Sequence, residues 1–370
     1  MLPYLLLLFV SAVFPLICYK NSTISFDGEE HNVLNEKRNK MTVTLFFFGL
    51  FILLALRDIS VGTDLKTYKR IFESCIYTSF ENLSNMQWER GYTFFCKALS
   101  LISKDYRFFL IVVAVITIIP IYKLYSKEKR YPFLILILFV NMPCFLMMFS
   151  GLRQAIAISI GVLVYMAIEN RKFFLSFLLI LLAVSFHVSA VALFLFYPAY
   201  HFQIRTKHLI WIVPALIGVW CFRISILTSI FSVLPAKYIE FYGEVQQTGA
   251  YGMMILFLIF SIFSFVVLDE NKMTKKDFFM RNFLLISTVA QFFVPIHGLV
   301  QRASYYFLIF VPTSILSVVK APKRMLKDIS NFAVIVLSAF FLFYFFCNAM
   351  FSKDNLLDVF PYKFFWSDQY

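Results

Sequence analysis

Ionisable side chains directly follow a long apolar run in the segment RDISVGTDLKTY. This segment holds Arg57, Asp58, Asp64 and Tyr68, and Gly62 lets the backbone turn sharply between them. An arginine beside carboxylates can form an ion pair at a helix end. It can equally bind an anionic substrate while a carboxylate accepts a proton. The segment alone leaves both interpretations open.

A second polar point is WERGY, which places Glu89 and Tyr92 just before the stretch GYTFFCKALSLIS. That stretch is too short and too polar to cross a membrane, and it is typical of a re-entrant or interfacial half-helix. A solvated ion pair beside an aromatic interface anchor is the alternative. Glu89 is therefore a candidate proton acceptor.

Arg153 and Gln154 lie between two strongly apolar runs that have almost no loop between them. A long arginine side chain can snorkel to the membrane surface. A guanidinium at that surface is also suited to bidentate binding of phosphate or pyrophosphate oxygens. We favour the anion-binding interpretation.

Two histidines mark further polar points. His187 stands between Ser185 and Ser189 within apolar sequence, and His297 precedes Arg302 in the segment VPIHGLVQRASYYF. A lone histidine in a protein core is most often structural. Among membrane-spanning residues an ionisable group is instead a functional candidate.

The segments between these polar points predict an all-α polytopic membrane protein. Of the 370 residues 61% are hydrophobic and 15% are charged, whereas about 25% are charged in an ordinary soluble domain. A spanning helix needs about 20 mainly apolar residues, so the chain predicts about 12 transmembrane helices in one domain over residues 1–370. The predicted spans are 2–19, 41–56, 108–125, 132–149, 153–168, 173–188, 189–203, 208–222, 251–268, 279–296, 303–319 and 329–350.

The loops between these spans form two alternating sets that differ in charge. The basic short loops of the first set contain KEKR at 127–130, RK at 171–172, KKD at 275–277 and KAPKR at 320–324. Such loops remain in the cytoplasm. The second set includes the long segments 57–107 and 223–250, which we expect to be extracytoplasmic and to hold interfacial helices.

This topology, derived from loop charge, puts the polar points on one outer face. They are Arg57, Asp58, Asp64, Glu89, Arg153, His187 and Arg302. Arginines can hold a diphosphate leaving group while a nearby base takes a hydroxyl proton. The face therefore suits a lipid-linked phosphosugar.

Composition also sets aside other classes of protein and site. The net charge is +13, but no segment is long enough for a soluble module with a basic face, so no nucleic-acid partner is expected. The cysteines show no metal-ligand spacing, although Cys75 and Cys96 could pair in an oxidising compartment. The first apolar run has no small-residue cleavage site and is expected to be a retained helix.

Several of these segments resemble motifs of the EpsG family, which is similar to Wzy-type polymerases of bacterial surface polysaccharides. The resemblance covers most of the chain, and its most specific parts are G-x-R-Q and F-H-x-S-A. The matching pieces are R-D-x-x-x-G-T-D-x-x-x-Y at 57–68, E-x-G-Y at 89–92, G-x-R-Q-x-I-A at 151–157 and F-H-x-S-A at 186–190, with weaker support from QRASYYF around Arg302 and from PY at 361–362.

The resemblance implies an inner-membrane glycosyltransferase with a GT-C-like bundle and a site on the periplasmic or exterior side. Its substrate would be an undecaprenyl-diphosphate-linked oligosaccharide, whose growing glycan moves to the non-reducing end of a new unit. By position, the diphosphate would be bound by Arg57, Arg153 and Arg302. The base would be His187, Asp58, Asp64 or Glu89.

The remaining expectations concern substrate contacts and cofactors. The substrate-binding candidates are Tyr68, Tyr92, Gln154, His297 and Tyr362. Some related transferases hold a metal through carboxylates, but Asp58 and Asp64 do not form a DxD, so we expect neither metal nor cofactor. Besides the bilayer, a chain-length regulator could be a partner.

Three other functions remain as alternatives. A ligase that transfers finished glycan would share the diphosphate site and differs only through the family motifs. A flippase or other transporter would show internal repeats and charged or broken helices near the midplane. Neither is recognisable in the sequence. A scaffold protein would leave Arg153 and His187 without a purpose.

Overall fold

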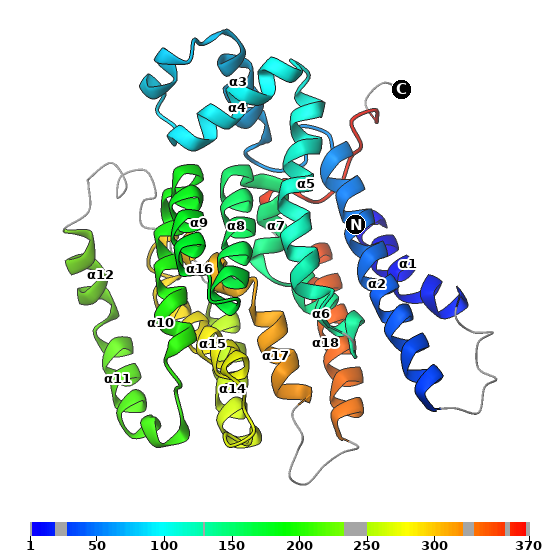
Figure 1. Cartoon of the computed structure of the whole chain (residues 1–370), viewed down its shortest axis with the longest axis vertical. Coiled ribbons are helices and arrows are strands. Elements are labelled where there is room, and N and C mark those ends of the chain that lie inside the picture. The colour runs from blue at the N-terminus through cyan, green and yellow to red at the C-terminus, as the bar shows by residue number, and fades with distance from the viewer. Residues whose placement is uncertain are drawn as a thin grey trace. The chain divides into compact units, whose positions relative to one another are not determined.

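The computed structural model describes residues 2–18, 28–128, 130–232, 250–320, 329–351 and 356–367 (Figure 1). Within these ranges the regular structure is helical. The only β-type pairing there is an isolated antiparallel bridge between Arg57 and Phe364. The predicted all-α class is therefore confirmed.

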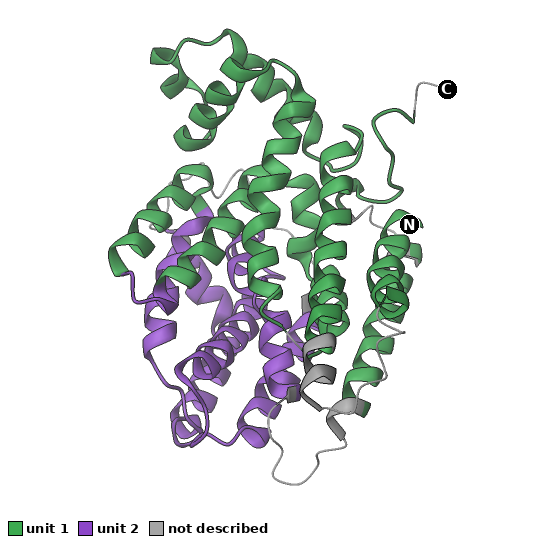
Figure 2. Ribbon diagram, turned by 45° about the vertical axis from the view of Figure 1, so that its right-hand side comes forward, with its two compact units in different colours: residues 1–167, 173–188, 332–370 green, residues 168–172, 189–331 purple. Residues whose placement is uncertain are grey.

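The chain forms two compact units (Figure 2). Unit 1 comprises Met1–Ala167, Phe173–Val188 and Phe332–Tyr370, and unit 2 comprises Ile168–Lys172 and Ser189–Asn331. The prediction of a single membrane domain over residues 1–370 is not tested by this division into two units and stays a prediction.

Unit 1 is built from the N-terminal helices and the last long helix. They are α1 (Leu2–Cys18), α2 (Gly28–Leu56), α3 (Leu65–Tyr77), α4 (Arg90–Ile102), α5 (Tyr106–Tyr125), α6 (Pro132–Val140), α7 (Pro143–Ser150), α8 (Leu152–Glu169), α9 (Phe173–Phe186) and α18 (Ile329–Phe351).

Unit 2 contains the shorter helices of the second half. They are the 3₁₀ helix η3 (Val188–Leu195), α10 (Phe196–His201), α11 (Leu209–Cys221), α12 (Arg223–Phe231), α14 (Ala250–Val267), α15 (Lys275–Phe293), α16 (Gly298–Leu308) and α17 (Val311–Lys320). Its core includes the ion pair of buried Arg281 with Glu270 at 2.9 Å.

Several helices have the length and composition of membrane spans. Among the described residues, three pass on their own: Asn35–Leu56, Tyr106–Tyr125 and Leu152–Glu169. Three bent pairs pass together, and four shorter apolar helices accompany them. This is the architecture of a polytopic membrane protein, while the number of about 12 spans stays a prediction.

The predicted continuous span 132–149 is instead broken into α6 and α7, which meet at 62°. Pro143 has no N–H to donate and disfavours helical geometry at the residue before it. Asn141 then uses its side-chain amide to donate to Ile137 O at 2.7 Å and to Phe341 O at 3.1 Å. The bend therefore leaves these carbonyl groups satisfied.

The C-terminal segment 356–367 folds back on the chain that follows α2. Asp58 N donates to Lys363 O at 3.0 Å, and Phe365 N donates to Leu56 O at 3.1 Å. Tyr362 Oη donates to Leu53 O at 2.8 Å. These long-range hydrogen bonds fasten the aromatic tail to the end of α2.

Gly62 is required where this chain crosses the backbone before α8. Its φ is +114°, and a Cβ there would lie 2.3 Å from Phe149 O and 3.2 Å from Ser150 Cα. We expect Gly62→Ala to destabilise the protein by about 1–3 kcal/mol because both the dihedral angle and the contact oppose a side chain. Thermal unfolding in detergent measures this. An unchanged midpoint would contradict it.

Candidate functional site

The helix ends that carry the sequence motifs meet at one end of unit 1. Here α2 ends at Leu56 and α9 at Phe186, while α5 begins at Tyr106 and α8 at Leu152. The amphipathic helices α3 and α4 lie at this same end, at the top of Figure 1. A short helix therefore forms in the predicted stretch as α4, while its re-entrant or interfacial position stays a prediction.

Three predicted site residues are in direct contact there. Glu89 precedes α4, Arg153 is in the first turn of α8, and His187 follows α9. Arg153 Nη1 donates to Glu89 Oε2, and His187 Nδ1 lies 3.2 Å from Glu89 Oε1. The Arg153, Glu89 and His187 side chains are 12%, 20% and 2% exposed. We call this set the Glu89 cluster.

Aromatic rings surround the cation of this cluster. The Arg153 guanidinium carbon lies 4.6 Å from the ring centre of Trp88, 5.9 Å from that of Tyr68 and 6.0 Å from that of Tyr92. Ring faces attract a cation and hold its planar group in place. Trp88 is not among the predicted site residues. Its position next to Glu89 in the sequence is the feature that could have identified it.

Glu89 carries its negative charge in this environment. Burial would raise the pKa of Glu89, but the His187 hydrogen bond and the Arg153 charge outweigh it and lower the pKa to about 2. A carboxylate at Nδ1 favours the imidazole tautomer with its proton on Nδ1. The lone pair of neutral His187 is then on Nε2, so His187 rather than Glu89 is suited to accept a proton.

The pKa of Glu89 gives a pH dependence of stability. Because the folded-state value lies below the unfolded value of about 4.3, Glu89 stabilises the fold above that pH, and this contribution is lost as pH falls toward 2. We expect the gap in unfolding temperature between wild type and Glu89→Gln to narrow from pH 6 to pH 3. A gap that is constant across this range, measured in detergent, would contradict the ion pair.

The segment 57–68 packs against the chain that leads into α8. Gly62 meets Phe149 and Ser150, and Asp64 N donates to Ser150 Oγ at 3.4 Å. Asp64 precedes α3, on which Tyr68 reaches Arg153. The first motif therefore supports the Glu89 cluster through the backbone.

Asp58 and Arg57 have different surroundings in this segment. Asp58 Oδ1 accepts the Ser60 N–H at 2.9 Å. Burial opposes ionisation of Asp58, but hydrogen bonds from Ser60 and Ile59 lower its pKa. Arg57 is 1% exposed and donates to Leu54 O, with its guanidinium 5.8 Å from the centre of the Phe149 ring. Its predicted contact with diphosphate stays a prediction.

Arg107 is a second arginine beside Arg57 at the end of α2, and it is not among the site residues predicted from the sequence. Its Nη1 donates to Ala55 O at 2.9 Å and to Arg57 O at 2.6 Å, and its guanidinium lies 4.2 Å from the centre of the Phe365 ring. It occupies the first turn of an apolar helix, where a basic residue alone carries little signal. The residue fastens α5, α2 and the tail to one another.

The remaining predicted residues lie outside the Glu89 cluster. Gln154 is buried on α8 next to Arg153, while Tyr362 is bound to Leu53 O. His297 caps α16 by accepting the Leu299 N–H at 3.2 Å, and Arg302 is on the same helix of unit 2. The roles assigned to these residues stay predictions.

Other predicted features are only partly described. The predicted outer loop 223–250 begins with α12, and residues 233–249 lie outside the described residues. Cys75 and Cys96 are buried free thiols on α3 and α4, not a disulfide. Within the described ranges no three His, Cys, Asp or Glu side chains gather as metal ligands would.

Comparison with known proteins identifies the family. Neither the curated proteins nor the solved structures yield a match. The model of the EpsG family matches residues 40–364, a range that contains the Glu89 cluster and all the motifs around it. The chain therefore belongs to the EpsG family, which is associated with polymerase-like roles in polysaccharide biosynthesis.

Proposed function

We propose that this protein is a polysaccharide repeat-unit polymerase of the bacterial inner membrane. It would transfer a growing glycan from undecaprenyl diphosphate to the non-reducing end of another lipid-linked repeat unit on the periplasmic or exterior face. The observation that supports this most directly is the contact of Glu89, Arg153 and His187, which come from three separate segments of the range that matches the family.

The chemistry follows from the geometry of the Glu89 cluster. His187 Nε2 takes the proton of the acceptor hydroxyl while Glu89 holds Nδ1 and stabilises the imidazolium. The acceptor oxygen forms a bond to the anomeric carbon, and the bond from that carbon to the diphosphate oxygen breaks. Negative charge develops on the leaving diphosphate, where a guanidinium is most effective.

Arg153 can serve both Glu89 and the diphosphate. A guanidinium has five N–H donors, and the hydrogen bond to Glu89 uses one nitrogen, Nη1. Trp88 lies beside the same group and is only half-buried, so part of its ring is open for a sugar to contact, whereas Tyr68 is buried and supports the guanidinium. The proposal therefore places Arg153 between the base and the leaving group.

Deletion of the protein tests this function in its native cell. We expect surface glycan to shrink from long chains to single repeat units on the lipid carrier or its final acceptor. Complete loss of surface glycan would contradict the proposal, because it is the result expected for a ligase or flippase. Gel separation of extracted glycans measures the chain-length distribution.

The side of the membrane has its own test. A topology reporter fused after Arg153 is expected to report an extracytoplasmic position. A cytoplasmic signal would contradict the proposed outer site, because Arg153 and its partners would then lie on the other face of the membrane.

A further inference from the structure

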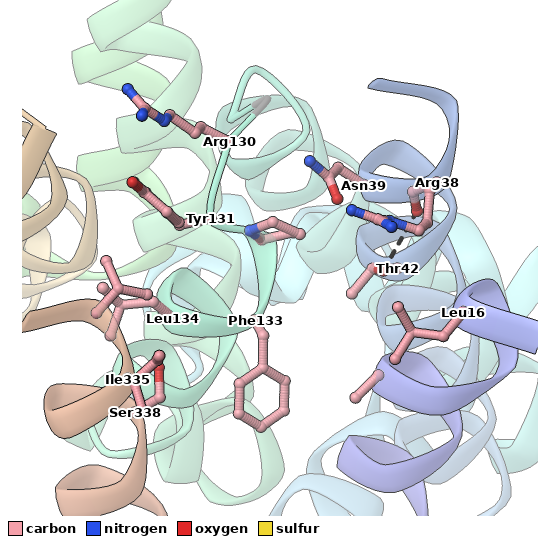
Figure 3. Close-up of a pocket in the computed structure, with 13 residues that line it drawn as sticks. Leu16, Arg38, Asn39, Thr42, Arg130, Tyr131, Phe133, Leu134, Ile335 and Ser338 are labelled. Atoms are coloured by element: carbon pink, nitrogen blue, oxygen red, sulfur yellow. Dashed lines mark hydrogen bonds between the residues drawn. The ribbon is translucent and has the colours of Figure 1, made fainter. Parts of the chain in front are cut away.

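Unit 1 contains a second polar site, in a cavity of about 420 Å³ (Figure 3). Helices α1, α2, α6 and α18 contribute to its lining. Figure 3 shows Arg38, Asn39 and Arg130 toward one end and apolar side chains such as Phe133 and Leu16 toward the other. The cavity is therefore amphipathic along its length.

The two arginines come from different parts of the chain. Arg38 is in the part of α2 that could span a membrane, and Arg130 is in the turn before α6. Glu128 Oε1 accepts the backbone N–H groups of Arg130 and Tyr131 at 2.7 and 3.3 Å, which fixes this turn. Both arginines line the cavity, and together they give its polar end a positive charge that suits an anion.

The cavity and the Glu89 cluster lie at opposite ends of α2. At 1.5 Å per helical residue, Arg38 is about 27 Å from Leu56 along the axis, and Leu56 adjoins the motif segment. This separation is close to the hydrocarbon thickness of a bilayer, about 30 Å. The cavity therefore opens at the membrane face that carries the basic loop KEKR at 127–130.

We propose that this cavity binds an anionic phospholipid of the cytoplasmic leaflet. The lipid phosphate lies between Arg38 and Arg130, and the first part of one acyl chain lies against Phe133, Leu134 and Ile335. Basic pockets between transmembrane helices suit anionic lipid head groups, whereas the apolar wall has no counterpart in a water-soluble phosphate. The lipid links the α1–α2 pair to α18.

We expect the cavity to prefer a ligand that has both a negative charge and an acyl chain. Full-length protein in neutral detergent is titrated with phosphatidylglycerol and with phosphatidylcholine, and bound lipid is counted by native mass spectrometry. We expect tighter binding of phosphatidylglycerol. Equal binding of the two lipids, or equal competition by glycerol phosphate, would overturn the proposal.

Paired variants locate the binding in the cavity. At about 1 kcal/mol for each basic residue, Arg38→Gln with Arg130→Gln is expected to weaken phosphatidylglycerol binding about thirtyfold. The matched control, Lys37→Gln with Lys40→Gln, removes two exposed charges from the same helix and is expected to bind like wild type. Equal loss in the two pairs would overturn the site.

A third variant, in the apolar wall, keeps the proposal testable if the charge variant fails to fold. Ser338 is half-buried at the cavity, and Ser338→Phe fills it without changing charge. We expect this variant to unfold at the wild-type temperature without lipid and to lose the added stability that phosphatidylglycerol gives the wild type. Retention of that full lipid-dependent gain would overturn the proposal.

Discussion

Arg153→Lys is expected to lower polymerisation by about 10²–10³-fold, although the variant keeps the positive charge. The guanidinium of Arg153 faces the Trp88 ring at 4.6 Å while it donates to Glu89. A lysine ammonium lacks both the plane and the fork of donors that allow this dual role. The expected surface glycan is therefore reduced to very short chains.

The measurement is the glycan chain-length distribution in a deletion strain that carries the variant, together with its level in the membrane. Arg90→Lys is the matched control, because Arg90 is exposed beside Glu89. We expect Arg90→Lys to restore long chains. Normal chains from Arg153→Lys at a normal protein level would contradict the proposed role of the guanidinium.

Gly91→Ala is expected to reduce polymerisation at least tenfold by moving α4 away from α9. A Cβ at Gly91 would lie 2.2 Å from Ser185 Oγ, 2.7 Å from Ser185 Cβ and 2.8 Å from Ser185 O. The backbone oxygen cannot turn aside as a flexible side chain can, so the helices must separate. His187 is two residues beyond this contact, and its 3.2 Å approach to Glu89 would lengthen.

Two further variants separate this effect from a general loss of helix stability. Gly218→Ala on α11 is the matched control, since nothing lies within 4 Å of its added Cβ, and alanine favours a helix by about 1 kcal/mol over glycine. Combining Gly91→Ala with Ser185→Gly removes the two side-chain contacts and is expected to restore part of the activity. Full activity of Gly91→Ala alone would show that the close approach does not matter.

Much of the site's placement is readable from the sequence because charge at a membrane face is costly. Glu89, Arg153 and His187 stand out as ionisable residues beside apolar runs, and loop charge assigns them to one face. The break at Pro143 is also explicable from the missing N–H, although hydropathy alone predicts a continuous span.

The sequence does not predict which carboxylate contacts His187. Asp58, Asp64 and Glu89 are all carboxylates in one predicted loop, and the structure shows Glu89 as the partner of His187, beside the close approach of Gly91 to Ser185. The fastening of the tail to α2 likewise depends on contacts between residues about 300 positions apart, such as Tyr362 with Leu53. Local sequence patterns do not predict contacts between residues so far apart in the chain.

The central claim is that the Glu89 cluster transfers glycan from a lipid diphosphate. Purified full-length protein is incubated with a synthetic undecaprenyl-diphosphate-linked repeat unit, and both chain length and released undecaprenyl diphosphate are measured. Wild type is expected to lengthen the chain and release one lipid diphosphate for each bond formed, and His187→Gln is expected to be slower by about 10²–10⁴-fold. Equal rates for the two proteins, or release of diphosphate without longer chains, would contradict the account.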